Sequence, residues 1–192
     1  MLTVEKLTLS QMEEVYHTDM EKDFPESELK PFAQIAELFE QGNYEGYGFF
    51  EHGTRMAYAF FSKGNLGNYV LLDYLAVCGH CRSKGYGSQI LPLLQETMKA
   101  YDGILGEVET PEFGHDETEK AVRERRMRYY HRFGFADTGL YCTLFGEHLS
   151  IICWGEEKVE DSAIYQAMDD IYRVMFNKKV YPGQVTLDYL EK

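Results

Sequence analysis

Two glycines that follow a buried strand make up the part of the sequence best suited to binding a ligand. The run Leu71 to Val77 is mostly apolar without regular polar alternation, as expected of a strand covered on both faces. Gly85 and Gly87 let the chain turn tightly and approach a ligand. The helix predicted to begin at Gly87 offers unpaired N–H groups and a partial positive charge. The segment therefore predicts a phosphate-binding site.

Two common phosphate-binding motifs do not fit this segment. A P-loop requires Gly-x-x-x-x-Gly-Lys-Ser/Thr, whereas one residue separates Gly85 from Gly87 and no lysine follows. A Rossmann fingerprint requires a third glycine three residues later, and that position is Ile90. A nucleotide-binding protein of either class is therefore disfavoured.

A third pattern fits, and two later blocks support it. The residues Arg82-Ser83-Lys84-Gly85-Tyr86-Gly87 match Gln/Arg-x-x-Gly-x-Gly/Ala directly after a strand ending Leu75-Ala76-Val77. The strand Ile104 to Glu109 with its Glu-Val pair and a helix ending Tyr130-x-x-x-Gly134-Phe135 follow in order. Together these blocks resemble the GNAT superfamily of N-acetyltransferases over residues 68 to 145. The resemblance implies an α/β (α+β) fold with a mixed, mostly antiparallel sheet, splayed parallel central strands and flanking helices.

The resemblance also implies acetyl-CoA as the cosubstrate and assigns its contacts. Main-chain amides are expected to hold the pyrophosphate, with positive charge from Arg82 and Lys84; plain surface exposure of these two side chains is the alternative. The N–H of Val77 or its neighbour is expected to stabilise the oxyanion. The predicted coenzyme contacts are Leu75, Val77, Arg82, Ser83, Lys84, Gly85, Tyr86, Gly87 and Ser88.

Protonation of the departing thiolate is assigned to Tyr130, four residues before Gly134, where the family commonly has its acid. A phenol with a pKa near 10 can give a proton to a thiolate formed beside it. The alternative is that Tyr130 packs on the inner face of its helix with Met127 and Phe133. Tyr129 is the neighbour that could be confused with it.

Deprotonation of the attacking amine leaves three candidates. Glu107 matches the carboxylate of the family's Glu-Val pair, and a partly buried carboxylate has a raised pKa, which suits a base. Its alternative role is pairing with an arginine between positions 123 and 132. Asp73 competes, because the two-residue strand period places it on one face with Leu75 and Val77. A chain of waters is the third candidate.

Composition limits the class of protein and of partner. The chain has 192 residues and 44% hydrophobic content, which suits one globular domain. With the resemblance, this implies a single GNAT-like domain over residues 1–192, with 155–192 as a C-terminal helical extension. The 32 acidic and 19 basic residues give a net charge of −13, which disfavours nucleic acid and anionic lipid and favours a cationic partner. A small-molecule primary amine fits this balance, although a solvated acidic surface also explains it.

Neither a targeting segment nor a metal site is predicted. The first 22 residues contain several acids and no apolar run, and no stretch is long enough to cross a bilayer, so a cytoplasmic protein without membrane contact is expected. The four cysteines are predicted to be reduced and structural, because a zinc site would need two further ligands at suitable spacing. They are Cys78, Cys81, Cys142 and Cys153.

The elements expected to position these groups begin with a strand over 2–7 and a helix that starts at the capping box Ser10-x-x-Glu13 and ends near Lys22. A second helix over 29–40 follows, with Ser27 before it and Gly42 as its stop. Strands over 47–51 and 55–61 are predicted to form a hairpin.

The remaining elements follow the phosphate-binding segment. A helix over 87–101 contains Pro92, so it must start late or bend. A helix capped by Asp116 ends at Gly134, and two strands over 138–145 and 148–154 close the sheet. The amphipathic stretch 162–176 could serve as a lid, a homodimer contact or core cover.

Three functions remain open from the sequence. The first is acetyl-CoA-dependent N-acetylation of a primary amine, possible acceptors being a small amine, a polyamine, an aminoglycoside or a protein N-terminus. The second is an inactive acyl-CoA-binding sensor, which the presence of Tyr130 and a carboxylate candidate disfavours. The third is transfer of a longer acyl or an aminoacyl group by the same fold. A protein N-acetyltransferase is the alternative within the first class.

Overall fold

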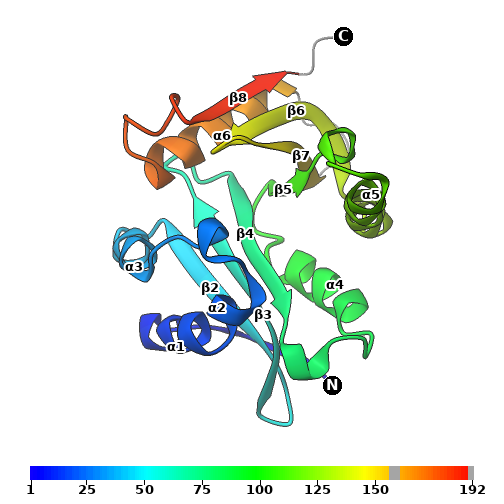
Figure 1. Ribbon diagram of the computed structural model, residues 1–192. Coiled ribbons are helices and arrows are strands. Elements are labelled where there is room, and N and C mark those ends of the chain that lie inside the picture. The colour runs from blue at the N-terminus through cyan, green and yellow to red at the C-terminus, as the bar shows by residue number, and fades with distance from the viewer. Residues whose placement is uncertain (156–160, 190–192) are drawn as a thin grey trace. The chain divides into compact units, whose positions relative to one another are not determined.

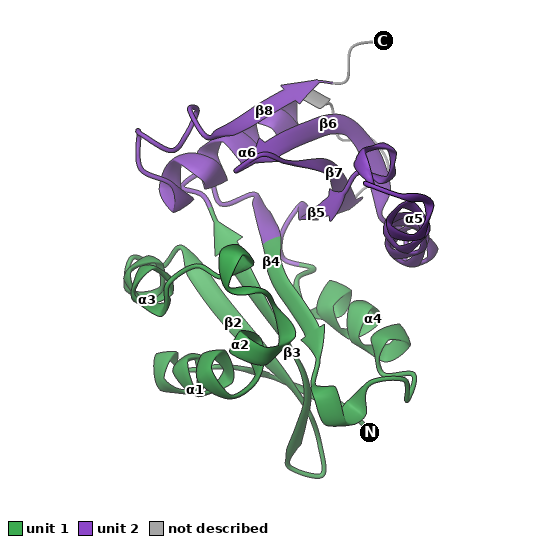
Figure 2. Ribbon diagram, viewed as in Figure 1, with its two compact units in different colours: residues 1–63, 72–99 green, residues 64–71, 100–192 purple. Residues whose placement is uncertain are grey.

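The computed structural model describes residues 1–155 and 161–189, which divide between two compact units (Figure 2). Unit 1 comprises residues 1–63 and 72–99, and unit 2 comprises residues 64–71 and 100–192. Strand β4 (Tyr69–Val77) contributes its first residues to unit 2 and the rest to unit 1. The single domain over residues 1–192 stays a prediction.

Unit 1 carries the strands β1 (Thr3–Lys6), β2 (Tyr44–Glu51) and β3 (Thr54–Lys63), in the order β1-β2-β3-β4 (Figure 1). Strands β1 and β2, and likewise β2 and β3, are antiparallel. The predicted hairpin is confirmed: its two-residue turn has positive φ at both His52 (51°) and Gly53 (77°), as the tight primed turns require.

The N-terminal helical region begins two residues earlier than predicted. Helix α1 (Leu9–Val15) is capped by Thr8, whose hydroxyl accepts from the N–H of Gln11 at 3.3 Å, while the Gln11 side chain accepts from the N–H of Thr8 at 2.8 Å. The predicted cap at Ser10 is therefore wrong, because Thr8 and Gln11 form a reciprocal capping box two residues upstream. A π-helical turn (Tyr16–Met20), α2 (Glu21–Asp23), a 3-10 turn (Glu26–Glu28) and α3 (Phe32–Glu40) follow.

Close packing explains the glycine in the middle of β2. A Cβ on Gly46 would lie 2.9 Å from Met12 Cγ and 3.0 Å from a ring carbon of Phe60. Helix α1 therefore sits directly over this strand. Helix α4 (Gly87–Thr97) buries Ile90 and Leu91 and keeps Pro92 in its interior, so it does not start late but ends four residues before the predicted limit.

Unit 2 carries β5 (Gly103–Glu109), β6 (Ala136–Leu144), β7 (Glu147–Gly155) and β8 (Val185–Tyr189) in the order β5-β7-β6-β8 (Figure 1). All three of these pairings are antiparallel. Helix α5 (Glu117–Arg132) has the predicted cap, since Asp116 Oδ1 accepts from the N–H of Glu119 at 2.8 Å. The fold is thus the predicted mixed α/β fold with a mostly antiparallel sheet and flanking helices, while the splay of β4 and β5 stays a prediction.

The C-terminal segment completes the core of unit 2. Helix α6 (Asp161–Met175) buries Ile164, Met168, Ile171 and Tyr172 in one cluster with residues of β6, β7 and β8. Of the three roles considered for this stretch, core cover is the one that the packing supports. Strand β8 was not predicted, because it is short and only Val185 and Leu187 are buried. Residues 156–160 and 190–192 of the predicted extension lie outside the described residues.

Cys78, Cys81, Cys142 and Cys153 are all free and buried, and their structural role stays a prediction. Within residues 1–155 and 161–189, no group of His, Cys, Asp or Glu side chains is arranged to hold a metal ion. None of the helices in these ranges has the length and apolar character needed to cross a membrane. The cytoplasmic location and the homodimer stay predictions.

Candidate active site

The loop before α4 presents main-chain N–H groups to solvent. Ser83 (φ 64°) and Gly85 (φ 82°) both adopt the left-handed conformation, and α4 has no side-chain cap at its start. Across the described part of the chain, the N–H groups of Ser83, Lys84, Gly85 and Tyr86 donate to no protein acceptor. Such a run of unpaired amides at a helix N-terminus is suited to binding an anion.

Two side chains of this segment, Arg82 and Tyr86, hold it to other parts of unit 1. The Arg82 guanidinium donates to the Asp23 carboxylate and, through Nε, to the carbonyl of Val77 at 3.3 Å. The Tyr86 hydroxyl donates to Glu51 Oε2 at 2.7 Å, and this bond lowers the pKa of Glu51, so the carboxylate stays ionised. Arg82 is thus paired with an acid, and the predicted positive charge at the loop is left mainly to the exposed Lys84.

The Cys-x-x-Cys pair anchors the start of the same loop. The N–H of Cys78 donates to the carbonyl of Met56 at 2.9 Å, and Cys81 Sγ lies 3.0 Å from Met56 Sδ. Burial raises the pKa of Cys78 to about 11, so this thiol is protonated at neutral pH. The pair therefore joins the loop to β3.

Of the remaining predicted coenzyme contacts, Leu75 and Val77 are half-buried near the end of β4, and Gly87 is the first residue of α4. Ser88 is exposed in the first turn of the helix. These positions place the whole predicted set on one strand end, one loop and one helix start. The oxyanion role of the Val77 N–H stays a prediction.

Asp73 is held in a buried ion pair. Lys30 Nζ lies 2.7 Å from Asp73 Oδ1, and the Tyr44 hydroxyl donates to Oδ2. The side chains of Lys30 and Asp73 are only 14% and 4% exposed. Burial, and then the Asp73 charge, raises the pKa of Tyr44 well above its usual value, so Tyr44 remains a donor. Both carboxylate oxygens are engaged, which argues for a structural role over that of a base.

This ion pair also orders the segment between α2 and α3. The Tyr74 hydroxyl accepts from the N–H of Lys30 at 2.9 Å and donates to the Glu28 carbonyl at 2.8 Å. The Tyr16 hydroxyl donates to the Lys30 carbonyl at 2.9 Å. Two tyrosines and one lysine thus hold a segment that has little regular structure of its own.

Replacing Asp73 by asparagine is expected to lower the free energy of unfolding by about 3–5 kcal/mol, because the Lys30 ammonium loses its buried counter-charge. Urea unfolding measures this loss, and the double variant Asp73→Asn/Lys30→Met should recover part of it. A fall in kcat with unchanged unfolding would instead restore Asp73 as a candidate base.

Tyr130 lies on α5 in unit 2, where its ring meets the rings of Phe135 and Tyr129, each at a centroid distance of 5.4 Å. The helix stops at Gly134 (φ 82°), and Phe135 folds back so that its N–H donates to the Tyr130 carbonyl at 3.3 Å. Burial raises the pKa of Tyr130, with Arg126 opposing the rise, so the phenol is protonated at neutral pH. That is the state a proton donor requires.

Glu107 lies on β5 and turns toward α6. Its Oε1 accepts from the Tyr172 hydroxyl and lies 3.8 Å from Cys142 Sγ. In the arginine-rich helix that follows, Arg126 pairs with Glu109, and Arg123 lies 2.6 Å from Glu119. Sequence reasoning identified Glu107 but not Tyr172, which stands in the C-terminal stretch beyond the resembling region. The only feature of the sequence that could have indicated Tyr172 was its place on the apolar face of a predicted amphipathic helix.

The candidates divide between the two units. The anion-binding loop and Asp73 belong to unit 1, and Glu107 and Tyr130 belong to unit 2. Within unit 1 the structure ties the loop to Asp23 and Glu51, and within unit 2 it ties Glu107 to the C-terminal helix. The predicted coenzyme-binding loop thus belongs to unit 1, and the predicted acid Tyr130 and base Glu107 belong to unit 2.

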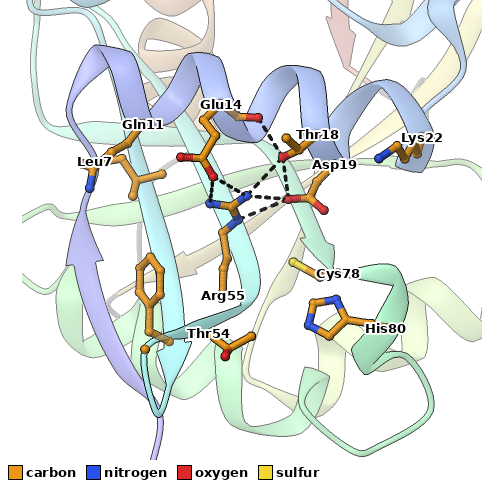
Figure 3. A pocket seen from close by; sticks show the side chains of 12 residues that line it. Leu7, Gln11, Glu14, Thr18, Asp19, Lys22, Thr54, Arg55, Cys78 and His80 are labelled. Carbon is orange, nitrogen blue, oxygen red and sulfur yellow. Dashed lines mark hydrogen bonds and ion pairs between the residues drawn. The ribbon is translucent and has the colours of Figure 1, made fainter.

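Unit 1 also contains a polar pocket of about 500 Å³ that the sequence did not indicate (Figure 3). Arg55 lies at its centre with Nη2 2.8 Å from Asp19 Oδ2 and Nη1 3.3 Å from Glu14 Oε1, and Thr18 accepts a further bond from it. Figure 3 shows Cys78 and His80 on the other side of the hollow. The charges at the centre of the pocket thus pair with one another.

Comparisons with known proteins support the predicted fold. A family model described as "Acetyltransferase (GNAT) family" matches residues 9–135. No curated protein matches the chain. A solved structure from Bacteroides thetaiotaomicron, described as of a GNAT-family acetyltransferase, is 18% identical with a TM-score of 0.68 and covers 99% of each chain.

Two further solved structures cover less of the chain. The ribosomal-protein-S18-alanine N-acetyltransferase from Escherichia coli is 16% identical with a TM-score of 0.58, covering 83% of this chain and 99% of its own. A mutant form of a spermidine/spermine N-acetyltransferase from Vibrio cholerae is 12% identical with a TM-score of 0.56, covering 80% and 94%. At these identities the likeness establishes the fold.

Proposed function

Because the chain belongs to the acetyltransferase (GNAT) family, whose model matches residues 9–135, we propose that it transfers an acetyl group from acetyl-CoA to the primary amine of a small cationic acceptor. The observation that carries the proposal is the loop of unpaired amides from Ser83 to Tyr86 at the start of α4. These groups suit the diphosphate of the coenzyme, since each can donate to an anionic oxygen.

The residues present supply the proton transfers that the reaction needs. The amine nitrogen attacks the thioester carbonyl, a C–N bond forms and the C–S bond breaks. Glu107 accepts the proton that the amine loses, and Tyr130 gives its proton to the departing thiolate, which leaves as free thiol. A tyrosine kept protonated by burial and a carboxylate held by a hydrogen-bond donor suit these two roles.

Charge supports a cationic acceptor. The chain carries a net charge of −13, and a field of that sign raises the local concentration of positively charged amines. One of the similar solved structures is named as a spermidine/spermine N-acetyltransferase, and another as acting on the alanine of a ribosomal protein. A polyamine-like amine agrees with the charge, and a peptide N-terminus is the alternative acceptor.

A thiol-release assay with acetyl-CoA over an amine panel tests the proposal. The panel holds spermidine, an aminoglycoside, a neutral primary amine and a peptide with N-terminal alanine. Thiol release that is fastest with the small cationic amines is the expected result. Release with the peptide alone would favour a protein N-acetyltransferase. Binding of coenzyme A by calorimetry without release from any amine would favour an inactive acyl-CoA-binding sensor.

A further inference from the structure

Helix α6 carries Tyr172, whose hydroxyl group contacts the candidate base Glu107. Tyr172 is completely buried in the core of unit 2, and its hydroxyl donates to Glu107 Oε1. Its ring packs against Phe176 and Tyr181 at centroid distances of 5.7 and 5.4 Å. The tyrosine therefore has little freedom to turn away from the carboxylate.

Strand register explains why Glu107 meets this helix. Side chains alternate along β5, so Glu107 shares a face with Leu105, which belongs to the core cluster that α6 covers. Glu107 stands opposite Ile151 of β7, another member of that cluster. A carboxylate in this apolar setting needs hydrogen-bond donors to remain ionised, because burial otherwise penalises the charge.

Tyr172 of α6 and Cys142 of β6 are titratable groups from the packed elements that contact Glu107. Burial, followed by the charge of Glu107, raises the pKa of both well above the usual values, so both are neutral at neutral pH. On α6, Asp169 lies one turn before Tyr172 and Arg173 directly follows it, and these two charged residues pair with each other at 2.7 Å. A neutral tyrosine is thus the stronger of the two donors, since a thiol at 3.8 Å is a weak one.

We propose that Tyr172 is a positioning residue for acetyl transfer, holding the Glu107 carboxylate ionised and oriented to accept the proton of the amine. The inference rests on the proposed function. It extends the active site beyond residues 9–135, which the family model matches, into helix α6. Helix α6, which covers the core of unit 2, would then also control the ionisation and orientation of the Glu107 carboxylate.

The test compares two buried tyrosines of the same core. In Tyr172→Phe the hydroxyl on Glu107 is lost; in the control Tyr181→Phe a hydroxyl that donates to Asp169 at 2.6 Å is lost instead. Losing a donor destabilises the ionised carboxylate, so the acidic limb of the kcat–pH profile of Tyr172→Phe should move to higher pH by about one unit or more. The control should keep the wild-type limb.

A double variant separates positioning from folding. If Tyr172 acts through Glu107, adding Tyr172→Phe to Glu107→Gln should lower kcat by less than about twofold further. An unmoved acidic limb in Tyr172→Phe, or full additivity in the double variant, would overturn the inference while wild-type turnover upholds the proposed function. Absence of thiol release by the wild type with every amine would overturn the proposed function itself, and with it this role of Tyr172.

Discussion

Replacing Tyr130 by phenylalanine is expected to lower kcat for thiol release by about 10²-fold or more, with the affinity for acetyl-CoA unchanged. The phenol supplies the proton that the departing thiolate needs, and phenylalanine keeps the ring that packs on Phe135. The loss should therefore appear in kcat rather than in stability. Steady-state kinetics at saturating acetyl-CoA, with calorimetry for coenzyme binding, make the measurement.

Tyr129→Phe is the matched control. Tyr129 is adjacent on α5, packs on Phe133 at a centroid distance of 5.2 Å, and has a pKa raised by burial to about 12. It thus shares the helix, the residue type and the protonated state of Tyr130. An equal loss of kcat in both variants, or an unchanged kcat in Tyr130→Phe, would remove Tyr130 from the role of acid.

The pH dependence of wild-type turnover should agree with this role. An acid acts only while protonated, so turnover falls as pH rises through the pKa of Tyr130. Burial raises that pKa above its usual value, and the falling limb should therefore lie on the alkaline side of pH 10. In Tyr130→Phe this limb should be absent.

Local signals predicted much of the fold. The hairpin turn at His52 and Gly53, the cap at Asp116 and the stop at Gly134 each follow from the conformational preferences of one or two residues, and each is present in the structure. The prediction that the first helix starts at Ser10 was wrong because two possible capping boxes overlap, Thr8 with Gln11 and Ser10 with Glu13. The structure uses the box formed by Thr8. Strand β8 was missed because only two of its residues are buried.

The environment of the candidate base depends on contacts that no local pattern encodes. Glu107 and Tyr172 are 65 positions apart in the chain, and Asp73 and Lys30 are 43 apart. The identity of each carboxylate could be proposed from a strand motif, whereas its partner depends on which face of the sheet a distant helix or loop covers. For this reason the sequence alone could not choose between Asp73 and Glu107 as the candidate base. The structure distinguishes the two carboxylates by their hydrogen-bond and ion-pair partners.

The coenzyme loop gives the second large effect. Gly85 has φ 82°, which costs a β-branched residue about 1–3 kcal/mol of backbone strain, and a Cβ there would meet nothing within 4 Å. Gly85→Val should therefore distort the run of amides without a steric clash, and the Kd for coenzyme A should rise roughly 10- to 100-fold. Calorimetric titration with coenzyme A measures the change directly.

Gly79→Val controls for the added side chain. Gly79 precedes the same loop and also has open space around its Cβ position, but its φ lies outside the left-handed region, so valine fits there without that strain. Its Kd should stay within about threefold of wild type, since exposed substitutions without strain have small effects. Equal weakening in both variants would mean that bulk, rather than the left-handed turn, disturbs binding. Unchanged affinity in Gly85→Val would mean that the amides from Ser83 to Tyr86 do not hold the diphosphate.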